Sequence, residues 1–137
     1  MNQPRPNGFE SGNGADALIY VVDDEPMLLE LTAVVLEPHG FKIKTFRDPQ
    51  SALQSFASAQ PPPVLVITDY AMHSMTGLEL IDACKSYHPQ LRTILLSGTV
   101  NETQVAGYST QPDIFIPKPY RVGAFVKTVI DLLKAPP

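Results

Sequence analysis

The chain has 137 residues and a mass of 15.0 kDa, which favours a single domain. Ten basic and fourteen acidic residues leave a net charge of -4, which argues against direct nucleic-acid binding by the domain as a whole. The single cysteine rules out an intramolecular disulfide. No apolar run approaches the ~20 residues that span a membrane, and the N-terminus lacks a signal-peptide core. We therefore predict a cytoplasmic protein without membrane insertion.

Residues 1 to about 15 are rich in Gly, Pro, Asn and Ser, and Phe9 is the one aromatic residue among them. Such a segment cannot bury enough apolar surface to offset the entropy lost on ordering. We predict a flexible N-terminal tail over residues 1–15 and one domain over residues 16–135.

Five short apolar runs follow the tail, most of them rich in β-branched or aromatic residues and bounded by turn formers. The first, third and fourth are almost continuously apolar, as expected of parallel strands covered on both faces. The second alternates charged and apolar residues, which predicts an edge strand. The five predicted strands are residues 17–22, 42–46, 64–68, 93–97 and 114–117.

Helical patterns separate these runs. The first predicted helix, residues 26 to about 37, starts with Pro26 after a candidate N-cap, Asp24. The second has Asp48 as its candidate cap. Between the fourth and fifth strands the helix formers are poor, so we predict a short or irregular helix near residues 102–108. The other predicted helices are residues 49–59, 76–87 and 122–134. The first helix carries an apolar series at helical spacing, namely Leu28, Leu29, Leu31, Val34 and Val35. Alternating strands and helices predict an α/β fold with a doubly wound parallel sheet.

Polar side chains follow four of the five predicted strands. Ligands of open parallel sheets bind beyond the carboxyl ends of the strands, so these side chains are expected to share one rim. Asp23 and Asp24 follow the first strand, Asp69 follows the third, Ser97 closes the fourth and Lys118 follows the fifth.

Three carboxylates in one place repel one another, and a hard divalent cation such as Mg²⁺ relieves that repulsion. Asp24 and Asp69 are the expected direct ligands, with Asp23 acting through water. A carboxylate beside a metal can attack phosphorus and form an aspartyl phosphate. The Lys118 ammonium and the Ser97 hydroxyl would then stabilise charge on the transferred group.

Four segments, in this order and at strand ends, carry a family resemblance. They are Val21-Val22-Asp23-Asp24-Glu25-Pro26; Thr68-Asp69-Tyr70-Ala71-Met72 with Met75 and Gly77; Leu95-Leu96-Ser97-Gly98; and Pro117-Lys118-Pro119-Tyr120. The chain resembles a response-regulator receiver domain of two-component signalling, over residues 17 to 134. The resemblance implies a flavodoxin-like (βα)5 fold with strand order 2-1-3-4-5.

The resemblance also implies roles for individual residues. Asp69 would be the phosphoacceptor, Asp23 and Asp24 would form the acidic pocket, and the backbone carbonyl of Ala71 would join them in binding Mg²⁺ or Mn²⁺. Ser97 would be the switch hydroxyl and Lys118 would contact the phosphoryl group through a loop with a cis Lys118–Pro119 bond. Phe115 matches an aromatic switch position, although a plain core residue fits it equally.

The implied donor is a histidine kinase or a histidine phosphotransfer protein. The domain would catalyse only its own phosphorylation and dephosphorylation. Because the last predicted helix ends near residue 134, we expect a stand-alone receiver whose output is an unknown downstream protein or onward relay. Dimer formation is left open.

Two positions depart from the family pattern. His73 and Ser74 occupy a loop where proline is frequent, and Gly98 stands where alanine is frequent. His73 is either an exposed loop residue or one that tunes the site or binds metal. Cys84 lies on an apolar helical stripe, which predicts a buried core residue.

The residues disfavour three other functions. A degenerate receiver would act as a phosphorylation-independent interaction module, which the intact acidic residues and Lys118 disfavour. A phosphohydrolase with an aspartyl intermediate would need an acid/base carboxylate at the position of Ala71. A flavin-binding module would place a phosphate against Asp23 and Asp24, which would repel it.

Overall fold

A computed structural model describes residues 17–136, so the predicted tail over residues 1–15 lies outside the described part. Among the helices within residues 17–136, none is long and apolar enough to cross a membrane. Within the described residues, five strands and five α-helices alternate, with one short 3-10 helix after the first α-helix.

All five strands pair in parallel in one sheet, in the order β2-β1-β3-β4-β5. This is the doubly wound order that the family resemblance implied, and β2 is the edge strand that its alternating pattern predicted. The strands are β1 (Leu18–Val22), β2 (Lys42–Phe46), β3 (Leu65–Asp69), β4 (Arg92–Ser97) and β5 (Ile114–Pro117). The helices are α1 (Pro26–Leu36), η1 (Glu37–His39), α2 (Pro49–Ser58), α3 (Gly77–Tyr87), α4 (Glu102–Val105) and α5 (Val122–Lys134).

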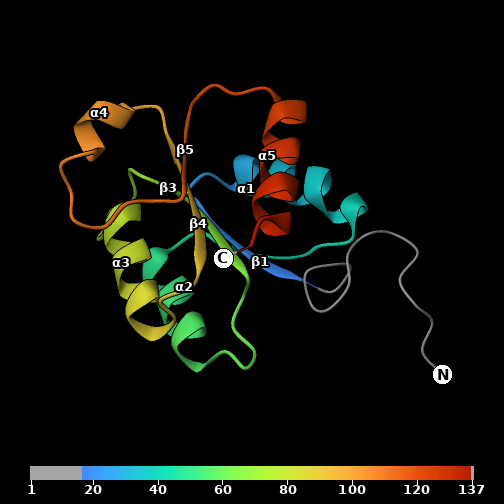
Figure 1. The fold of residues 1–137 in the computed structure, drawn as a ribbon, viewed down its shortest axis with the longest axis horizontal. Helices are drawn as coiled ribbons and strands as arrows, with labels where there is room; N and C mark the ends of the chain where they lie inside the picture. Colours follow the sequence, from blue (N-terminus) through green and yellow to red (C-terminus); the bar gives the residue numbers. More distant parts are fainter. Residues whose placement is uncertain (1–16, 137) are drawn as a thin grey trace.

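Helices cover both faces of the sheet, with α1 and α5 on one side and α2 and α3 on the other (Figure 1). Alternate residues of one strand therefore enter different clusters. Val21 packs with Leu29 of α1 and Val129 of α5, whereas Tyr20 packs with Phe56 of α2. Burial on both faces explains why β1, β3 and β4 are almost continuously apolar.

Side-chain caps start three of the five α-helices in the described part of the chain, namely α2, α3 and α4. Asp48 accepts a hydrogen bond from the backbone N–H of Ser51 and caps α2, as predicted. Thr76 and Glu79 form a reciprocal capping box at the start of α3. The prediction of Asp24 as the cap of α1 is wrong, because Glu25 occupies that position and makes no side-chain cap bond. Pro26 tolerates this start because it has no N–H to satisfy.

One face of α1 remains unburied. Leu29 is buried, but Met27 is 80% exposed, Leu31 42% and Val34 60%. The apolar series predicted for this helix is therefore divided between the core and the exposed surface. Leu29 enters the core, while Leu31 and Val34 face solvent.

The α4 region is short, as predicted, and is held by side chains. Four residues form the helix, and Asn101 caps it. The Gln111 side chain then donates to the backbone carbonyls of Val105 and Tyr108. These bonds satisfy carbonyl groups at and just beyond the end of α4, which no helical N–H fully uses.

Candidate functional site

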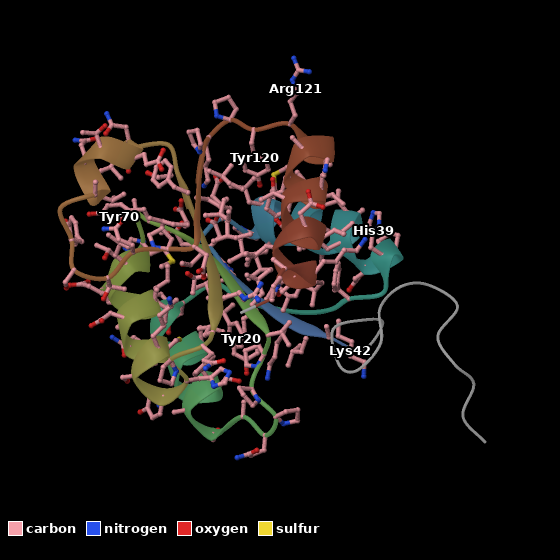
Figure 2. The ribbon with its side chains drawn as sticks, viewed as in Figure 1. Tyr20, His39, Lys42, Tyr70, Tyr120 and Arg121 are labelled. Atoms are coloured by element: carbon pink, nitrogen blue, oxygen red, sulfur yellow. The ribbon has the colours of Figure 1, made fainter. Side chains whose placement is uncertain are left out.

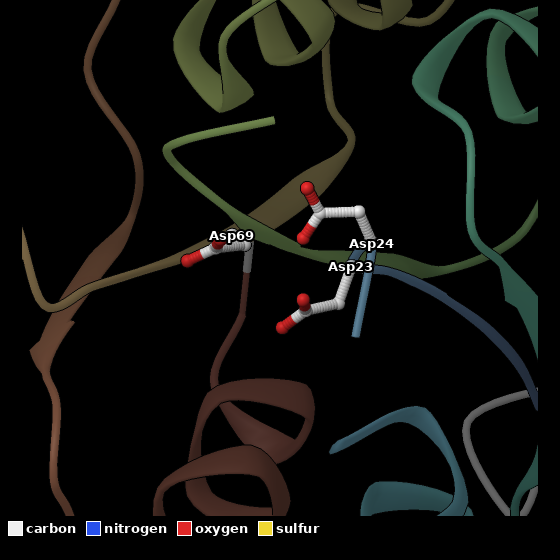
Figure 3. Close-up of side chains that lie close together, drawn as sticks. All are labelled: Asp23, Asp24 and Asp69. Atoms are coloured by element: carbon white, nitrogen blue, oxygen red, sulfur yellow. The ribbon is translucent and has the colours of Figure 1, made fainter. Parts of the chain in front are cut away.

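Three carboxylates meet where β1 and β3 end side by side. Asp23 and Asp24 directly follow β1, and Asp69 is the last residue of β3. One oxygen from each carboxylate lies within 4.8 Å of the others, and Figure 3 shows the three side chains gathered together. Asp23 is fixed by accepting a hydrogen bond from the backbone N–H of Glu25 at 3.0 Å.

Lys118 brings a positive charge to this cluster from beyond β5. Its Nζ lies 3.0 Å from Oδ1 of Asp69 and 3.4 Å from Oδ2 of Asp23. The backbone N–H of Lys118 donates to the carbonyl of Ser97 at 2.9 Å, which ties the lysine to the end of β4. The Lys118–Pro119 bond is cis, as predicted; the Gln60–Pro61 bond is also cis.

Burial governs the charges of the site. Burial raises the pKa of Asp23 and of Asp69, and the nearby Lys118 ammonium offsets this in part. Burial by itself would lower the pKa of Lys118, but its hydrogen bond to Asp69 and the charge of Asp23 outweigh it and raise that pKa. The lysine therefore stays protonated between two carboxyl groups that are costly to ionise.

The backbone around Asp69 is closely packed. A Cβ atom on Gly77 would lie 2.3 Å from the carbonyl oxygen of Asp69, so a side chain does not fit there. The N–H of Gly77 donates to the carbonyl of Tyr70, and the N–H of Tyr70 donates to Leu96 of β4, each at 2.8 Å. These contacts fix where the Asp69 side chain leaves the sheet.

The donor set is all oxygen and carries three potential negative charges, with two of the three residues buried. Hard divalent cations such as Mg²⁺ prefer oxygen ligands of this kind and usually retain water. The residues present thus fit a magnesium-type site with Asp23, Asp24 and Asp69 as its ligands.

The family profile described as response regulator receiver domain matches residues 19–130 of this sequence. The chain belongs to the response-regulator receiver family. The matched range contains every strand except the first residue of β1, and all the residues of the acidic cluster and Lys118.

Known relatives of this receiver include two regulators. The nitrogen assimilation regulatory protein NtrX of Azorhizobium caulinodans is 35% identical over 109 residues, which is 79% of this chain and 24% of NtrX. The probable transcriptional regulatory protein TcrX of Mycobacterium tuberculosis is 30% identical over 123 residues, which is 89% of this chain and 52% of TcrX. This chain thus spans about a quarter to a half of these relatives.

A receiver domain protein (CheY-like) from Methanospirillum hungatei has a closely similar solved structure. Its TM-score is 0.79 at 21% identity, and the match covers 86% of this chain and 94% of that one. At this identity the likeness concerns the fold, and it agrees with the observed strand order.

The receiver's other predicted residues lie in different surroundings. Ser97 is buried, and its Oγ accepts hydrogen bonds from the N–H groups of Thr99 and Val100 at 3.1 and 3.0 Å. Phe115 is half-buried against a cluster that contains Leu95 and Val105. Ala71 is exposed in the loop after β3. Cys84 is buried, as predicted, and burial raises the pKa of its thiol to about 12.

Two features near the receiver site were not expected from the sequence. The hydroxyl groups of Tyr70 and Tyr108 lie 3.5 Å apart, so the residue after Asp69 contacts the segment after α4. Figure 2 shows Tyr70 beside α3 and below α4. Gly77 belongs to one of the family motifs, but the motif does not predict its close approach to Asp69. A glycine at the first position of a helix, where it is a poor helix former, was the available signal.

Proposed function

We propose that Asp69 is the phosphoacceptor of this receiver. A carboxylate oxygen of Asp69 attacks the phosphorus of a phosphohistidine, forming a P–O bond as the P–N bond to the donor breaks. The observation that carries this assignment is the Lys118 ammonium 3.0 Å from Oδ1 of Asp69, within a group of three carboxylates. The donor imidazole leaves as the neutral ring after taking up a proton.

Asp23, Asp24 and Asp69 would hold Mg²⁺ or Mn²⁺, together with the backbone carbonyl of Ala71. When bound, the ion neutralises the carboxylates and the negative phosphoryl oxygens. Lys118 supplies a second positive charge that is already in place before the phosphoryl group arrives. Preorganised charge of this kind lowers the barrier to transfer without reorganisation.

Ser97 and Phe115 would carry the signal away from Asp69. Ser97 must give up the hydrogen bonds that its Oγ accepts from Thr99 and Val100 before it can turn to a phosphoryl group. Phe115 shares its apolar cluster with Val105 of α4, so a change in its packing reaches that helix. The output is a second packing arrangement of α4 and β5, read by a downstream protein or used in onward relay.

An exposed apolar surface beside the site supports a protein as the phosphodonor. A groove of about 420 Å³ lies next to α1. Its lining residues are Leu28, Leu31, Lys118, Pro119, Tyr120 and Val122. Lys118 belongs both to this groove and to the acidic site. A histidine kinase or phosphotransfer protein seated there, in the cytoplasm, would have its phosphohistidine close to Asp69.

Phosphorylation by a small donor tests the assignment directly. Wild type and Asp69→Asn are incubated with Mg²⁺ and acetyl phosphate, and intact mass is read. We expect a gain of one phosphoryl group in the wild type and none in the variant. A gain in both proteins would overturn the choice of Asp69. No gain in either, repeated with a phosphorylated histidine donor, would favour the degenerate, phosphorylation-independent module.

A further inference from the structure

The ammonium of Lys118 belongs to a loop between β5 and α5, and the backbone of that loop decides where the charge lies. At its start, the backbone N–H of Lys118 donates to the carbonyl of Ser97 at 2.9 Å. Pro119 follows and has no N–H to donate. A lysine carries its charge at the end of a flexible four-carbon chain, so the place of the ammonium depends on how firmly the backbone below it is held. The next residue, Tyr120, supplies a second anchor.

Tyr120 is held by its aromatic ring. The rings of Tyr120 and Phe125 are stacked, with centroids 5.0 Å apart and planes at 29°. Phe125 is buried in the core cluster that joins α1 and α5 to the sheet, and Tyr120 packs against that cluster. Figure 2 shows Tyr120 beside the start of α5. Burial raises the pKa of the Tyr120 hydroxyl, and a hydrogen bond with Thr32 of α1 offsets this in part.

The two stacked residues occupy defined positions at the start of α5. Arg121 is the N-cap residue and makes no side-chain cap bond, so Tyr120 directly precedes the cap and Phe125 is the fourth residue of the helix. An apolar contact between these two positions is a hydrophobic staple, which fixes the angle at which the chain enters a helix. The N–H of Phe125 donates to the carbonyl of Arg121 at 2.9 Å, which also joins the two ends of the staple through the backbone.

The side of the loop that faces α1 is open. The groove of about 420 Å³ described above is lined by Lys118, Pro119 and Tyr120 together with residues of α1 and α5. A loop that borders a groove has room to shift in that direction. The staple on Phe125 is therefore the contact that opposes such a shift from the α5 end of the loop.

We propose that Tyr120 is a positioning residue, and that its stack on Phe125 holds Lys118 where the ammonium reaches Asp69. The inference rests on the phosphoryl transfer to Asp69 proposed above. The Lys118 ammonium lies 3.0 Å from Oδ1 of Asp69 before any phosphoryl group is bound. A charge assists transfer most when it does not have to be moved into place during the reaction. Loss of the staple leaves the charge present but misplaced.

Three single substitutions separate the ring from the rest of the side chain. Tyr120→Leu removes the stack and keeps an apolar residue, whereas Tyr120→Phe keeps the ring and removes only the hydroxyl. Tyr87→Leu is the control, because it removes a ring paired with Phe56, at 6.5 Å between centroids, from the end of α3 away from Asp69. Each variant is incubated with Mg²⁺ and acetyl phosphate, and the rate of mass gain is measured. Urea unfolding shows that each variant is folded in the assay.

We expect Tyr120→Leu to slow phosphorylation by roughly 10- to 100-fold, the cost of misplacing a reacting group by about 1 Å. Tyr120→Phe should recover at least about half of the wild-type rate, because the staple is intact. Tyr87→Leu should stay within about twofold of the wild type, as surface substitutions usually do.

Combination with Lys118→Met shows whether Tyr120 acts through the lysine. In that background there is no ammonium to position, so adding Tyr120→Leu should not slow the reaction further. A general structural defect would instead slow both backgrounds by the same factor. If Tyr120→Leu does not fold, Phe125→Leu removes the same stack from the α5 side and enters the same comparison.

Three results would overturn the proposal. A wild-type rate in folded Tyr120→Leu would show that the stack does not position Lys118. Equal slowing by Tyr120→Leu with and without Lys118→Met would mean that Tyr120 acts on another part of the site. A rate in Tyr120→Phe as low as in Tyr120→Leu would assign the effect to the hydroxyl and Thr32. The proposed function fails separately, if the wild type itself gains no phosphoryl group.

Discussion

The Nζ atom of Lys118 lies 3.0 Å from Oδ1 of Asp69, although their strands β5 and β3 are not neighbours in the sheet. Strand β4 lies between them, and the lysine reaches across its end. The backbone N–H of Lys118 donates to the carbonyl of Ser97, the last residue of β4. This hydrogen bond fixes the lysine backbone beside the end of β4. Asp69, the proposed phosphoacceptor, and the Lys118 ammonium are thus linked through the strand that carries the proposed switch residue.

Replacing Lys118 by methionine keeps the length of the side chain but removes its charge. We expect phosphorylation of Asp69 by acetyl phosphate to slow by roughly 10²–10³-fold, as happens when one preorganised electrostatic group is lost. The rate of mass gain measures this. Lys127→Met is the control, because that lysine pairs with Asp131 on the exposed surface of α5. An unchanged rate in Lys118→Met would show that Lys118 does not assist the transfer.

The acidic pocket should make the metal-free protein less stable as the pH rises. Burial raises the folded-state pKa of Asp23 and Asp69, so the folded state holds these protons more tightly than the unfolded state. The resulting stabilisation is present below the ordinary carboxyl pKa and is lost as pH increases through the raised folded values. Thermal unfolding with a chelator, from pH 4 upward, follows this loss.

Asp23→Asn should reduce that pH dependence. The amide oxygen can still accept from the N–H of Glu25, while the buried charge is gone. At neutral pH without metal we expect the melting temperature to rise by roughly 2–8 °C, the shift that about 1 kcal/mol produces in small domains. Added Mg²⁺ should raise the melting temperature of the wild type more than that of the variant. A lower melting temperature in Asp23→Asn would contradict the argument.

The sequence predicted the site better than it predicted the loops around it. Parallel strands end at one edge, so residues that follow β1, β3 and β5 must meet there whatever the details of packing. Asp23, Asp24, Asp69 and Lys118 were found in this way. Asp48 was equally predictable, because an N-cap depends on bonds within three residues.

Other features depend on tertiary structure that local patterns do not encode. Nε2 of His73 lies 3.9 Å from Oδ2 of Asp24, and the next residue, Ser74, has φ 70; the loop sequence predicts neither feature. Leu31 and Val34 fit the helical apolar pattern but remain exposed, because α1 packs on the sheet through Leu29 and Leu36. Asp24 resembled a cap by position alone, yet its carboxylate joins the acidic cluster.

The exposed face of α1 should matter for a protein donor and not for a small one. Leu31 lines the groove beside Lys118, so Leu31→Asp places a charge where an apolar partner surface would bind. We expect transfer from a phosphorylated histidine protein to fall about tenfold, equivalent to ~1.4 kcal/mol of binding. The rate with acetyl phosphate should stay the same. Glu30→Ala, an exposed neighbour on α1, is the control.

If phosphorylation of Leu31→Asp were slowed equally with both donors, the substitution would damage the site itself. No slowing with the protein donor would place the docking surface away from this groove.

Gly77 provides a test of how tightly Asp69, the proposed phosphoacceptor, is held. In Gly77→Ala the new methyl group would lie 2.3 Å from the carbonyl oxygen of Asp69 and 2.7 Å from Cδ1 of Leu95. The backbone must shift, and overpacking of this kind costs roughly 1–3 kcal/mol of the free energy of unfolding. We also expect slower phosphorylation, because the displaced atoms belong to Asp69 itself.

Gly123→Ala is the matched control for Gly77→Ala. Gly123 lies in α5, and a Cβ atom there meets nothing within 4 Å. Alanine is the better helix former, so this variant should be more stable by roughly 0.5–1 kcal/mol. Relative to the wild type, the urea concentration at the midpoint of unfolding should therefore fall for Gly77→Ala and rise for Gly123→Ala. If Gly77→Ala unfolded at the same urea concentration as Gly123→Ala, the close contact between Gly77 and Asp69 would not constrain the position of Asp69.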